Sequence, residues 1–300
     1  GTQTSNLFSL LNEKDGKIRG FDAGVAQLLT RYILGDGSKF QFTQVNSSTR
    51  EQVLINDQVD MVLATYSITP ARAEKISFAG PYYTSQAGVL VKANNTAIKS
   101  YNDLAGKKVA TQAGSTGPAI LAQFAPKATV QEFQTHQEAL DALRQGRVDA
   151  YVTDYTLLLN ALSQGTGDTK LAGEPFGAKD PYGVGLPKGS DGVAFVNAFL
   201  KKVEADGTWA KLWTISIGQR TGSTAVPTPP ALPEPVSIAD GRGFQASGRL
   251  WACLRAGPFA DMEAHSAVVR GGLRAGHGGD GTPAPPAAAA ALRADFLRRD

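Results

Sequence analysis

The residues with the clearest chemical potential form a run of hydroxyl-bearing side chains that leads to an arginine. Residues 61–64 make a short apolar run, which is typical of a buried strand. The polar residues that follow are Thr65, Tyr66, Ser67, Thr69 and Arg72. Thr69 before Pro70 predicts a helix start, so Arg72 falls in the first turn beside open backbone N–H groups. Hydroxyl groups, N–H donors and a guanidinium at a strand end suit a carboxylate or another small anion. A capped surface helix with a solvated arginine is the alternative.

Two further positions repeat this arrangement of polar groups after a predicted strand. Gln112 is followed by a glycine turn with Ser115 and Thr116, and Pro118 then opens a helix, so N–H donors are bared toward an anion. Asp154 follows the apolar residues 150–152, where a carboxylate is awkward to bury without a cation. A capped turn and a helix N-cap are the respective alternatives.

Arg50 is a second candidate for anion binding. The loop 46–49 carries amide and hydroxyl groups and leads into a predicted helix, 50–56, whose first turn holds this arginine. A guanidinium makes a planar fork that matches a carboxylate. The alternative is a solvent-facing arginine that pairs with Glu51 or Glu74.

The elements that must position these residues alternate between strand and helix, which argues for an α/β protein with parallel strands. Asp15-Gly16 predicts a hairpin turn. Asp22 would cap a helix that runs to about Ile33, and His136 near a helix start is expected at the surface. Residues 1–4 are expected to end a first strand. Further strands are expected at 40–45, 61–64, 86–92, 108–111, 129–133 and 150–153, and further helices at 117–124, 135–143, 157–162, 193–205 and 208–217, with Trp209 and Trp213 in the core.

The two halves of the chain echo each other. Q-V-D-M-V-L-A-T ends one run of elements, and R-V-D-A-Y-V-T-D ends the other. Open α/β sheets bind ligands at the carboxyl ends of strands, so two such lobes would form a cleft between them. Extended segments near Leu90 and Val184 are the expected hinge.

Composition narrows the possible functions. The 300 residues are 42% hydrophobic and carry a net charge of +3, without a basic stripe that would favour nucleic acid. No apolar run approaches the roughly 18 residues of a membrane span. The single cysteine, Cys253, excludes an internal disulfide, and the three histidines show no metal-ligand spacing. We therefore expect no cofactor and no metal.

The composition changes beyond a proline-rich stretch at 221–235. Residues 236–300 hold eight arginines and no lysine, whereas the earlier chain holds fifteen lysines and seven arginines. This tail is rich in Gly, Ala and Pro, so we expect a disordered extension or an out-of-frame translation of GC-rich coding sequence.

The segments Y-S-I-T-x-x-R and I-S-F-A-G-P-Y-Y resemble the extracytoplasmic amino-acid-binding proteins of ABC importers. The resemblance covers residues 16–233. It implies an α/β, two-lobed periplasmic-binding-protein fold of type II, in which each lobe is a mostly parallel sheet flanked by helices and two strands form the hinge. The expected limits are 1–91 for the first part of lobe 1, 92–180 for lobe 2 and 181–220 for the return to lobe 1.

The resemblance also assigns roles to the site residues. Arg72 would hold the ligand's α-carboxylate with help from Thr65, Ser67 and Thr69, and Asp154 would receive the α-ammonium group. Arg50 would hold a side-chain carboxylate, so glutamate is expected first, aspartate second, and glutamine more weakly. The second lobe would contribute Gln112, Ser115 and Thr116, and Tyr66 would supply a wall of the site.

A binding protein without catalysis is therefore expected, acting as a monomer with an ABC transporter permease as its partner. Its location would be the periplasm, or the cell surface as a lipoprotein in a Gram-positive organism. The alternatives are a receptor for glutamine or another polar amino acid, the ligand-sensing domain of a signalling receptor, and a dehydratase on the same fold.

Overall fold

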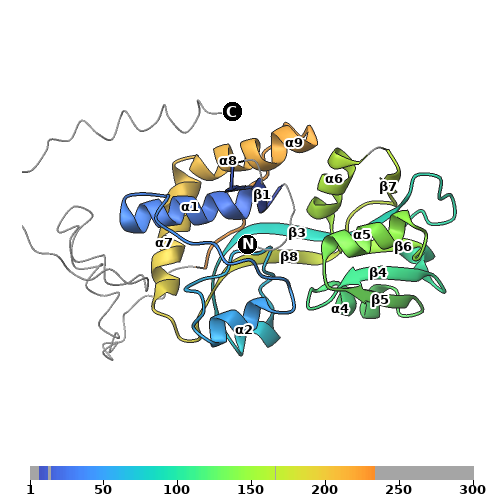
Figure 1. The fold of residues 1–300 in the computed structure, drawn as a ribbon, viewed down its shortest axis with the longest axis horizontal. Helices are drawn as coiled ribbons and strands as arrows, with labels where there is room; N and C mark the ends of the chain where they lie inside the picture. Colours follow the sequence, from blue (N-terminus) through green and yellow to red (C-terminus); the bar gives the residue numbers. More distant parts are fainter. Residues whose placement is uncertain (1–6, 13–14, 166, 234–300) are drawn as a thin grey trace, which may run out of the picture. The chain divides into compact units, whose positions relative to one another are not determined.

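The computed structural model describes residues 7–12, 15–165 and 167–233 (Figure 1). The expected strand end at 1–4 and the tail at 236–300 lie outside these residues. The first described strands form a hairpin in which β1 (Leu10–Asn12) pairs with β2 (Lys17–Arg19), with Leu10 opposite Arg19. This confirms the turn predicted at Asp15-Gly16.

Three helices of the first lobe follow the hairpin. They are α1 (Phe21–Leu34), α2 (Arg50–Ile55) and α3 (Pro70–Ala73). The helix start at Thr69 is confirmed, because its side chain accepts a hydrogen bond from the backbone N–H of Arg72 at 3.3 Å. The expected cap at Asp22 is wrong, since Gly20 occupies the cap position and Asp22 lies buried inside the helix.

Two segments predicted as strands in this lobe form no regular ladder among the described residues. Residues 40–44 are irregular, and the alternating aromatic residues Phe40 and Phe42 pack against each other, with ring centroids 4.3 Å apart. Residues 61–64 are mostly buried, as expected of a strand, and Val62 pairs with Gly185 in an isolated bridge. Burial of this apolar run was therefore predicted correctly, and a regular ladder for it stays a prediction.

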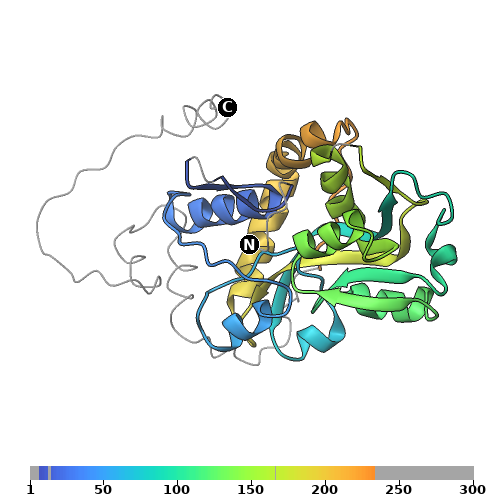
Figure 2. The same cartoon turned by 45° about the vertical axis from the view of Figure 1, so that its right-hand side comes forward.

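Two long antiparallel strands connect the lobes. β3 (Ser77–Lys92) pairs with β8 (Phe176–Leu186) from Ser77 opposite Leu186 to Ala87 opposite Phe176. Figures 1 and 2 show them running side by side between the two groups of helices.

The side chains of these strands contribute to two hydrophobic cores, and along β3 the change from one core to the other falls between Tyr83 and Ala87. Tyr83 belongs to the first core and Ala87 to the second. Leu90 lies in the second lobe's core and Val184 in the first, so the hinge expected at these two residues is displaced toward the middle of both strands.

The second lobe is built on a sheet in the order β5-β4-β6-β3-β7. Its new strands are β4 (Lys108–Gln112), β5 (Thr129–Phe133), β6 (Ala150–Asp154) and β7 (Thr169–Leu171). Strands β4, β5 and β6 run parallel, as predicted, whereas β6 meets β3 in antiparallel pairing.

Helices cover both faces of this sheet because successive strand residues point to opposite sides. Val109 and Val152 face the core that holds Leu121 of α4 (Gly117–Phe124). Ala110 and Tyr151 face the core shared by α5 (His136–Arg144) and α6 (Tyr155–Gln164). A short 3₁₀ helix, η1 (Tyr101–Leu104), packs Leu104 into the first of these cores.

The chain then returns to the first lobe. The elements are α7 (Gly192–Ala205), α8 (Thr208–Trp213), a π-helical turn η2 (Thr214–Gly218) and α9 (Gln219–Thr221). Trp209 and Trp213 are buried in the first core, as predicted, and Trp209 Nε1 donates to the carbonyl of Tyr82 at 2.8 Å. α9 also contacts α6 of the second lobe (Figure 2). In the described part of the chain, none of the helices combines the length and apolarity that a membrane span requires.

His136 departs from its predicted surface position. It is buried at the start of α5, and its Nδ1 lies 2.8 Å from the hydroxyl oxygen of Tyr151. Burial lowers the pKa of His136 from 6.5 to about 4, with a smaller contribution from the charge of Arg144. The folded protein therefore holds this imidazole neutral under conditions in which the unfolded chain protonates it.

This burial predicts a pH-dependent loss of stability. The stabilisation is fully present above the unfolded-state pKa of 6.5 and is lost as the pH falls toward the folded-state value of about 4. The total loss is about 3 kcal/mol of the free energy of unfolding. Urea titrations at pH 7.0 and 4.5 would measure it, with His136→Gln as the comparison. An equal loss in both proteins would contradict the assignment.

Candidate functional site

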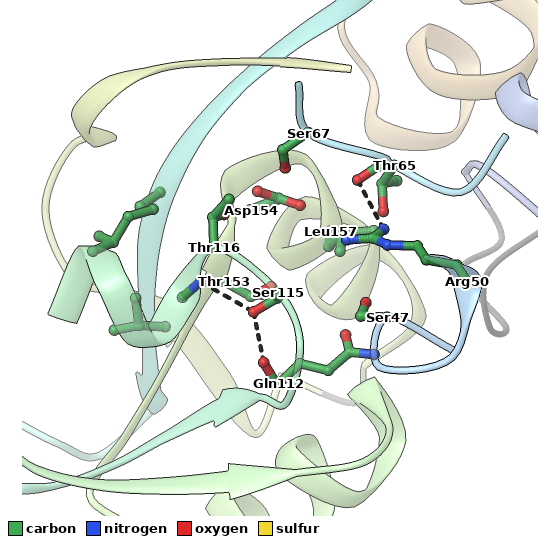
Figure 3. A pocket seen from close by; sticks show the side chains of 14 residues that line it. Ser47, Arg50, Thr65, Ser67, Gln112, Ser115, Thr116, Thr153, Asp154 and Leu157 are labelled. Atoms are coloured by element: carbon green, nitrogen blue, oxygen red, sulfur yellow. Dashed lines mark hydrogen bonds between the residues drawn. The ribbon is translucent and has the colours of Figure 1, made fainter. Parts of the chain in front are cut away.

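A pocket lies where the two lobes meet (Figure 3). Seven of the ten predicted site residues line it: Arg50, Thr65, Ser67, Gln112, Ser115, Thr116 and Asp154. The other three, Tyr66, Thr69 and Arg72, are not part of this lining. The remaining wall is formed by Ser47, Ala87, Gly117, Ile120, Val152, Thr153 and Leu157. Sequence reasoning therefore identified most of the polar lining and did not identify its apolar part.

Arg50 enters the pocket from the start of α2, and it is only 2% exposed. Its Nη1 donates to the carbonyl oxygens of Ala64 at 2.7 Å and Thr65 at 3.4 Å. Its guanidinium carbon lies 4.1 Å from the ring centroid of Tyr66. The solvent-facing alternative is thus wrong.

Glu51, one of the two acidic partners in the alternative prediction for Arg50, is engaged elsewhere. Glu51 lies 3.3 Å from Lys75 Nζ and 3.7 Å from Arg72 Nε. Among the residues that the structure describes, Arg50 forms no ion pair, and its Nε has no hydrogen-bond acceptor. Burial, followed by the charge of Arg72, lowers the pKa of Arg50 to about 10, so it stays charged at neutral pH. The pocket therefore contains a buried cation with donor capacity left over.

Thr65 and its neighbour Ala64 present the carbonyl groups that hold Arg50. The backbone of Thr65 has a φ of 43°, a left-handed conformation that is costly for a β-branched residue. The carboxylate of Asp22 accepts a hydrogen bond from the Thr65 N–H at 2.8 Å and another from the Tyr82 hydroxyl at 2.7 Å. Asp22, mistaken for a helix cap from the sequence, is therefore a support for the arginine site.

Arg72 is buried beside the pocket and bridges the lobes. Its Nη1 donates to the carbonyl oxygen of Ser67 at 2.9 Å, and its Nη2 to that of Gly114 at 2.8 Å. Ser67 belongs to the first lobe and Gly114 to the loop after β4 in the second. Tyr66 lies under both arginines and is fully buried, so it supports them and does not line the pocket as the wall that we expected.

The loop after β4 brings the second lobe against the first. Gly114 has a φ of +72°, and a methyl group added there would lie 2.7 Å from the Ser48 Cα atom. Ser48 Oγ donates to Gln134 Oε1 at 3.1 Å across the same contact. Ser115 Oγ donates to the carbonyl oxygen of Gln112 at 2.6 Å and accepts from the Gly117 N–H at 3.0 Å, which fixes the loop at the start of α4 (Figure 3).

Asp154 carries the opposite charge into the pocket from the end of β6. Burial and, to a smaller extent, the neighbouring carboxylate of Asp180 raise the pKa of Asp154 to about 7, whereas Tyr182 and Arg50 oppose the rise.

Asp180 is the residue that sequence reasoning missed. It is buried on β8, and its Oδ2 accepts hydrogen bonds from Ser67 Oγ at 3.0 Å and Thr116 Oγ1 at 3.1 Å. The signal available was the two-residue period of the strand, which sets Asp180 on the same face as Tyr182 and Val184. From the sequence, this segment was considered only as part of the hinge near Val184.

The pocket and the residues beside it thus combine two arginines, two carboxylates and several hydroxyl groups. Within the described ranges, no cluster of His, Cys, Asp and Glu side chains is arranged to hold a metal ion. Guanidinium groups bind carboxylates, and carboxylates bind ammonium groups, so the pocket can hold a small molecule that carries both charges.

Comparison with known proteins gives a consistent result. Residues 1–216 match the bacterial extracellular solute-binding proteins, family 3. The ABC transporter glutamine-binding protein GlnH of Bacillus subtilis is 36% identical over 211 residues, which span 70% of this chain and 76% of GlnH. The glutamate-binding protein GluB of Corynebacterium glutamicum is 33% identical over 220 residues, which span 70% of this chain and 74% of GluB.

Solved structures agree on the fold. The cysteine-binding protein of Campylobacter jejuni superimposes with a TM-score of 0.68 at 28% identity, over 73% of this chain and 87% of that protein. An ancestral arginine-binding protein bound to glutamine superimposes with a TM-score of 0.67 at 32% identity, over 72% of this chain and 96% of that protein. The two-lobed fold of type II periplasmic binding proteins is thereby confirmed. The chain belongs to the bacterial extracellular solute-binding proteins of family 3.

Proposed function

We propose that this protein is the receptor of an ABC importer for an acidic amino acid, with glutamate bound in preference to aspartate and glutamine. The family and the relatives GlnH and GluB support an amino-acid receptor of an ABC importer. The preference for glutamate is the finer part of the proposal. Its location would be extracytoplasmic, in keeping with the family, and its protein partner would be the importer's permease.

The single observation that carries the glutamate preference is the state of Arg50. A buried guanidinium with a free N–H and no carboxylate partner in the described part of the chain is costly, and an anionic ligand group would relieve that cost. The side-chain carboxylate of glutamate offers two acceptor oxygens to this fork, whereas the amide of glutamine offers one.

The remaining charged residues of the site indicate where the α-carboxylate and the α-ammonium group of the ligand would bind. We assign the α-carboxylate to Arg72, whose bond to the Gly114 carbonyl oxygen would be exchanged for stronger charged hydrogen bonds. We assign the α-ammonium group to Asp154, with Ser67, Thr116 and the Ser115 loop completing the lining.

A glutamine receptor is the second candidate, because GlnH is a glutamine-binding protein and Gln112 lines the same pocket. A glutamine ligand would leave the charge of Arg50 uncompensated. The choice between the two ligands therefore depends on a single side chain, and it can be tested there.

Replacing Arg50 by alanine tests the assignment. We expect a loss of about 2–5 kcal/mol in glutamate binding, because a buried charge pair is removed. The loss for glutamine should be much smaller. Isothermal titration of both ligands against wild type and Arg50→Ala would measure it, with Arg220→Ala, an exposed arginine on α9, as the control. Equal losses for both ligands, or a wild type that prefers glutamine, would contradict the glutamate preference.

Ligand capture would also require the lobes to close around it, since Arg50 and Arg72 come from one lobe and Asp154 from the other. Gly114 lies at the closest approach between them, where a Cβ atom would lie 2.7 Å from Ser48 Cα and 2.8 Å from Ser47 C. Gly106 has nearly the same φ, +73°, but its Cβ would meet nothing within 4 Å. Replacing each glycine by alanine therefore separates two effects. Both substitutions strain a left-handed backbone, but only the one at Gly114 adds a methyl group at the contact between the lobes.

We expect Gly114→Ala and Gly106→Ala to lose similar stability, about 1 kcal/mol each, from the left-handed backbone. Only Gly114→Ala should lose affinity, by at least about tenfold, because the closed state becomes less populated. Small-angle scattering should show the wild type and Gly106→Ala contracting with ligand, and Gly114→Ala contracting less. Unchanged affinity in Gly114→Ala would argue against the observed contact as the closed state.

A further inference from the structure

Asp180 has no role in the site as assigned so far, although it is placed within it. It stands on β8 opposite Ser85 of β3, and Asp154 stands on β6 opposite Ala87 of the same strand. The two aspartates therefore flank β3 on neighbouring strands, with small side chains between them. Ala87, one of these, lines the pocket.

The hydrogen bonds of Asp180 place its carboxylate at the pocket. Oδ2 accepts from Ser67 Oγ and from Thr116 Oγ1, and both of these residues line the pocket, one from each lobe. Figure 3 shows Asp154 between Ser67 and Thr116. Asp154 and the partners of Asp180 thus meet at one point of the cleft.

We propose that Asp154 and Asp180 together form the binding site for the ligand's α-ammonium group, and that this group replaces a proton which the two carboxylates share in the empty site. The proposal rests on the assignment of the ammonium group to Asp154. It does not depend on which amino acid is bound, because every α-amino acid carries this group.

The electrostatics of the pair support a shared proton. Burial is the main cause that raises the pKa of each aspartate, and the carboxylate of Asp180 also raises the pKa of Asp154. Like charges in a common buried site favour retention of one proton. The ionisable groups that act on the pair from the surrounding elements are Arg50, Arg72, Tyr83, Tyr151 and Tyr182. The tyrosines stay neutral near pH 7, since burial raises their pKa values.

An ammonium group suits this position chemically. It carries one positive charge and has three N–H donors, so it can donate to both carboxylates at once. Once its charge lies between them, both carboxylates can ionise, and the shared proton passes to the buffer. Each molecule of amino acid bound then releases up to one proton.

The release of a proton on binding determines how ligand affinity depends on pH. The pKa of Asp154 in the empty site is about 7, so the pair holds its proton below that value and binding must displace it. Affinity should therefore fall by up to about tenfold for each pH unit below 7 and become constant above about pH 8. Between pH 5.5 and 7.5 a glutamate side chain, with a pKa of about 4.3, does not titrate.

Isothermal titration at pH 6.0 in two buffers of different ionisation enthalpy counts the protons released. We would use L-glutamate and L-glutamine separately and base the count on whichever binds more tightly. We expect the wild type to release roughly half a proton to one proton at pH 6.0 and close to none at pH 8.0. A wild type that releases no proton at pH 6.0 and binds equally at pH 5.5 and 7.5 would overturn the proposal without any variant.

Asp180→Asn then tests the partner. The amide oxygen of asparagine still accepts from Ser67 and Thr116, so the fold should be kept, which circular dichroism and thermal unfolding would check. We expect at least about a tenfold loss of affinity at pH 7.5, since a charged hydrogen-bond partner is removed, and a smaller proton release at pH 6.0. Asp180→Glu should recover part of both, and Glu132→Gln, an exposed carboxylate on β5, should match the wild type. Unchanged affinity and proton count in Asp180→Asn would refute the pairing.

The outcome is separable from that of the proposed function. A preference for glutamine would overturn the glutamate assignment and leave the proton count interpretable. A glutamate preference without proton release would support the glutamate assignment and overturn the proposal of a shared proton.

Discussion

The burial of the Arg50 charge is the constraint on which the site depends. A guanidinium that is 2% exposed must be held by dipoles where no carboxylate reaches it. The protein supplies the carbonyl oxygens of Ala64 and Thr65 and the face of Tyr66. The left-handed backbone of Thr65 makes this possible, and Asp22 holds it from the opposite side. The backbone strain at Thr65 thus supports the buried charge of Arg50, which remains available to bind an anion.

Sequence patterns predicted the second lobe well because its signals are local. The strand at 129–133 and the helix start at Thr135 were found at the observed positions, since a period of two and a capping box each extend over a few residues. The first lobe was predicted less well. Its segments at 40–45 and 61–64 have strand-like composition, but within the described residues their pairing is limited to isolated bridges.

The site shows the same division. Arg50, Ser115, Thr116 and Asp154 were found because each lies beside a local boundary of an element. The role of Asp22 depends on Thr65, 43 positions away, and Asp180 binds Ser67 and Thr116, which are 113 and 64 positions away. No spacing rule joins residues at such separations. His136 was misplaced for a similar reason, because the partner of its ring, Tyr151, lies on a different element.

Asp180 lies on a connecting strand and is bonded to both lobes, so its contacts bear directly on closure. Ser67 from one lobe and Thr116 from the other donate to the same oxygen atom. Opening the cleft must break at least one of these bonds, as well as the bond from Arg72 to the Gly114 carbonyl oxygen. Such bonds contribute about 1 kcal/mol each, so they bias the lobes toward each other without locking them. A ligand that offers a carboxylate to Arg72 and an ammonium group to the aspartates replaces weak contacts by charged ones at the same points. The energy for closure would then come from the same groups that recognise an amino acid.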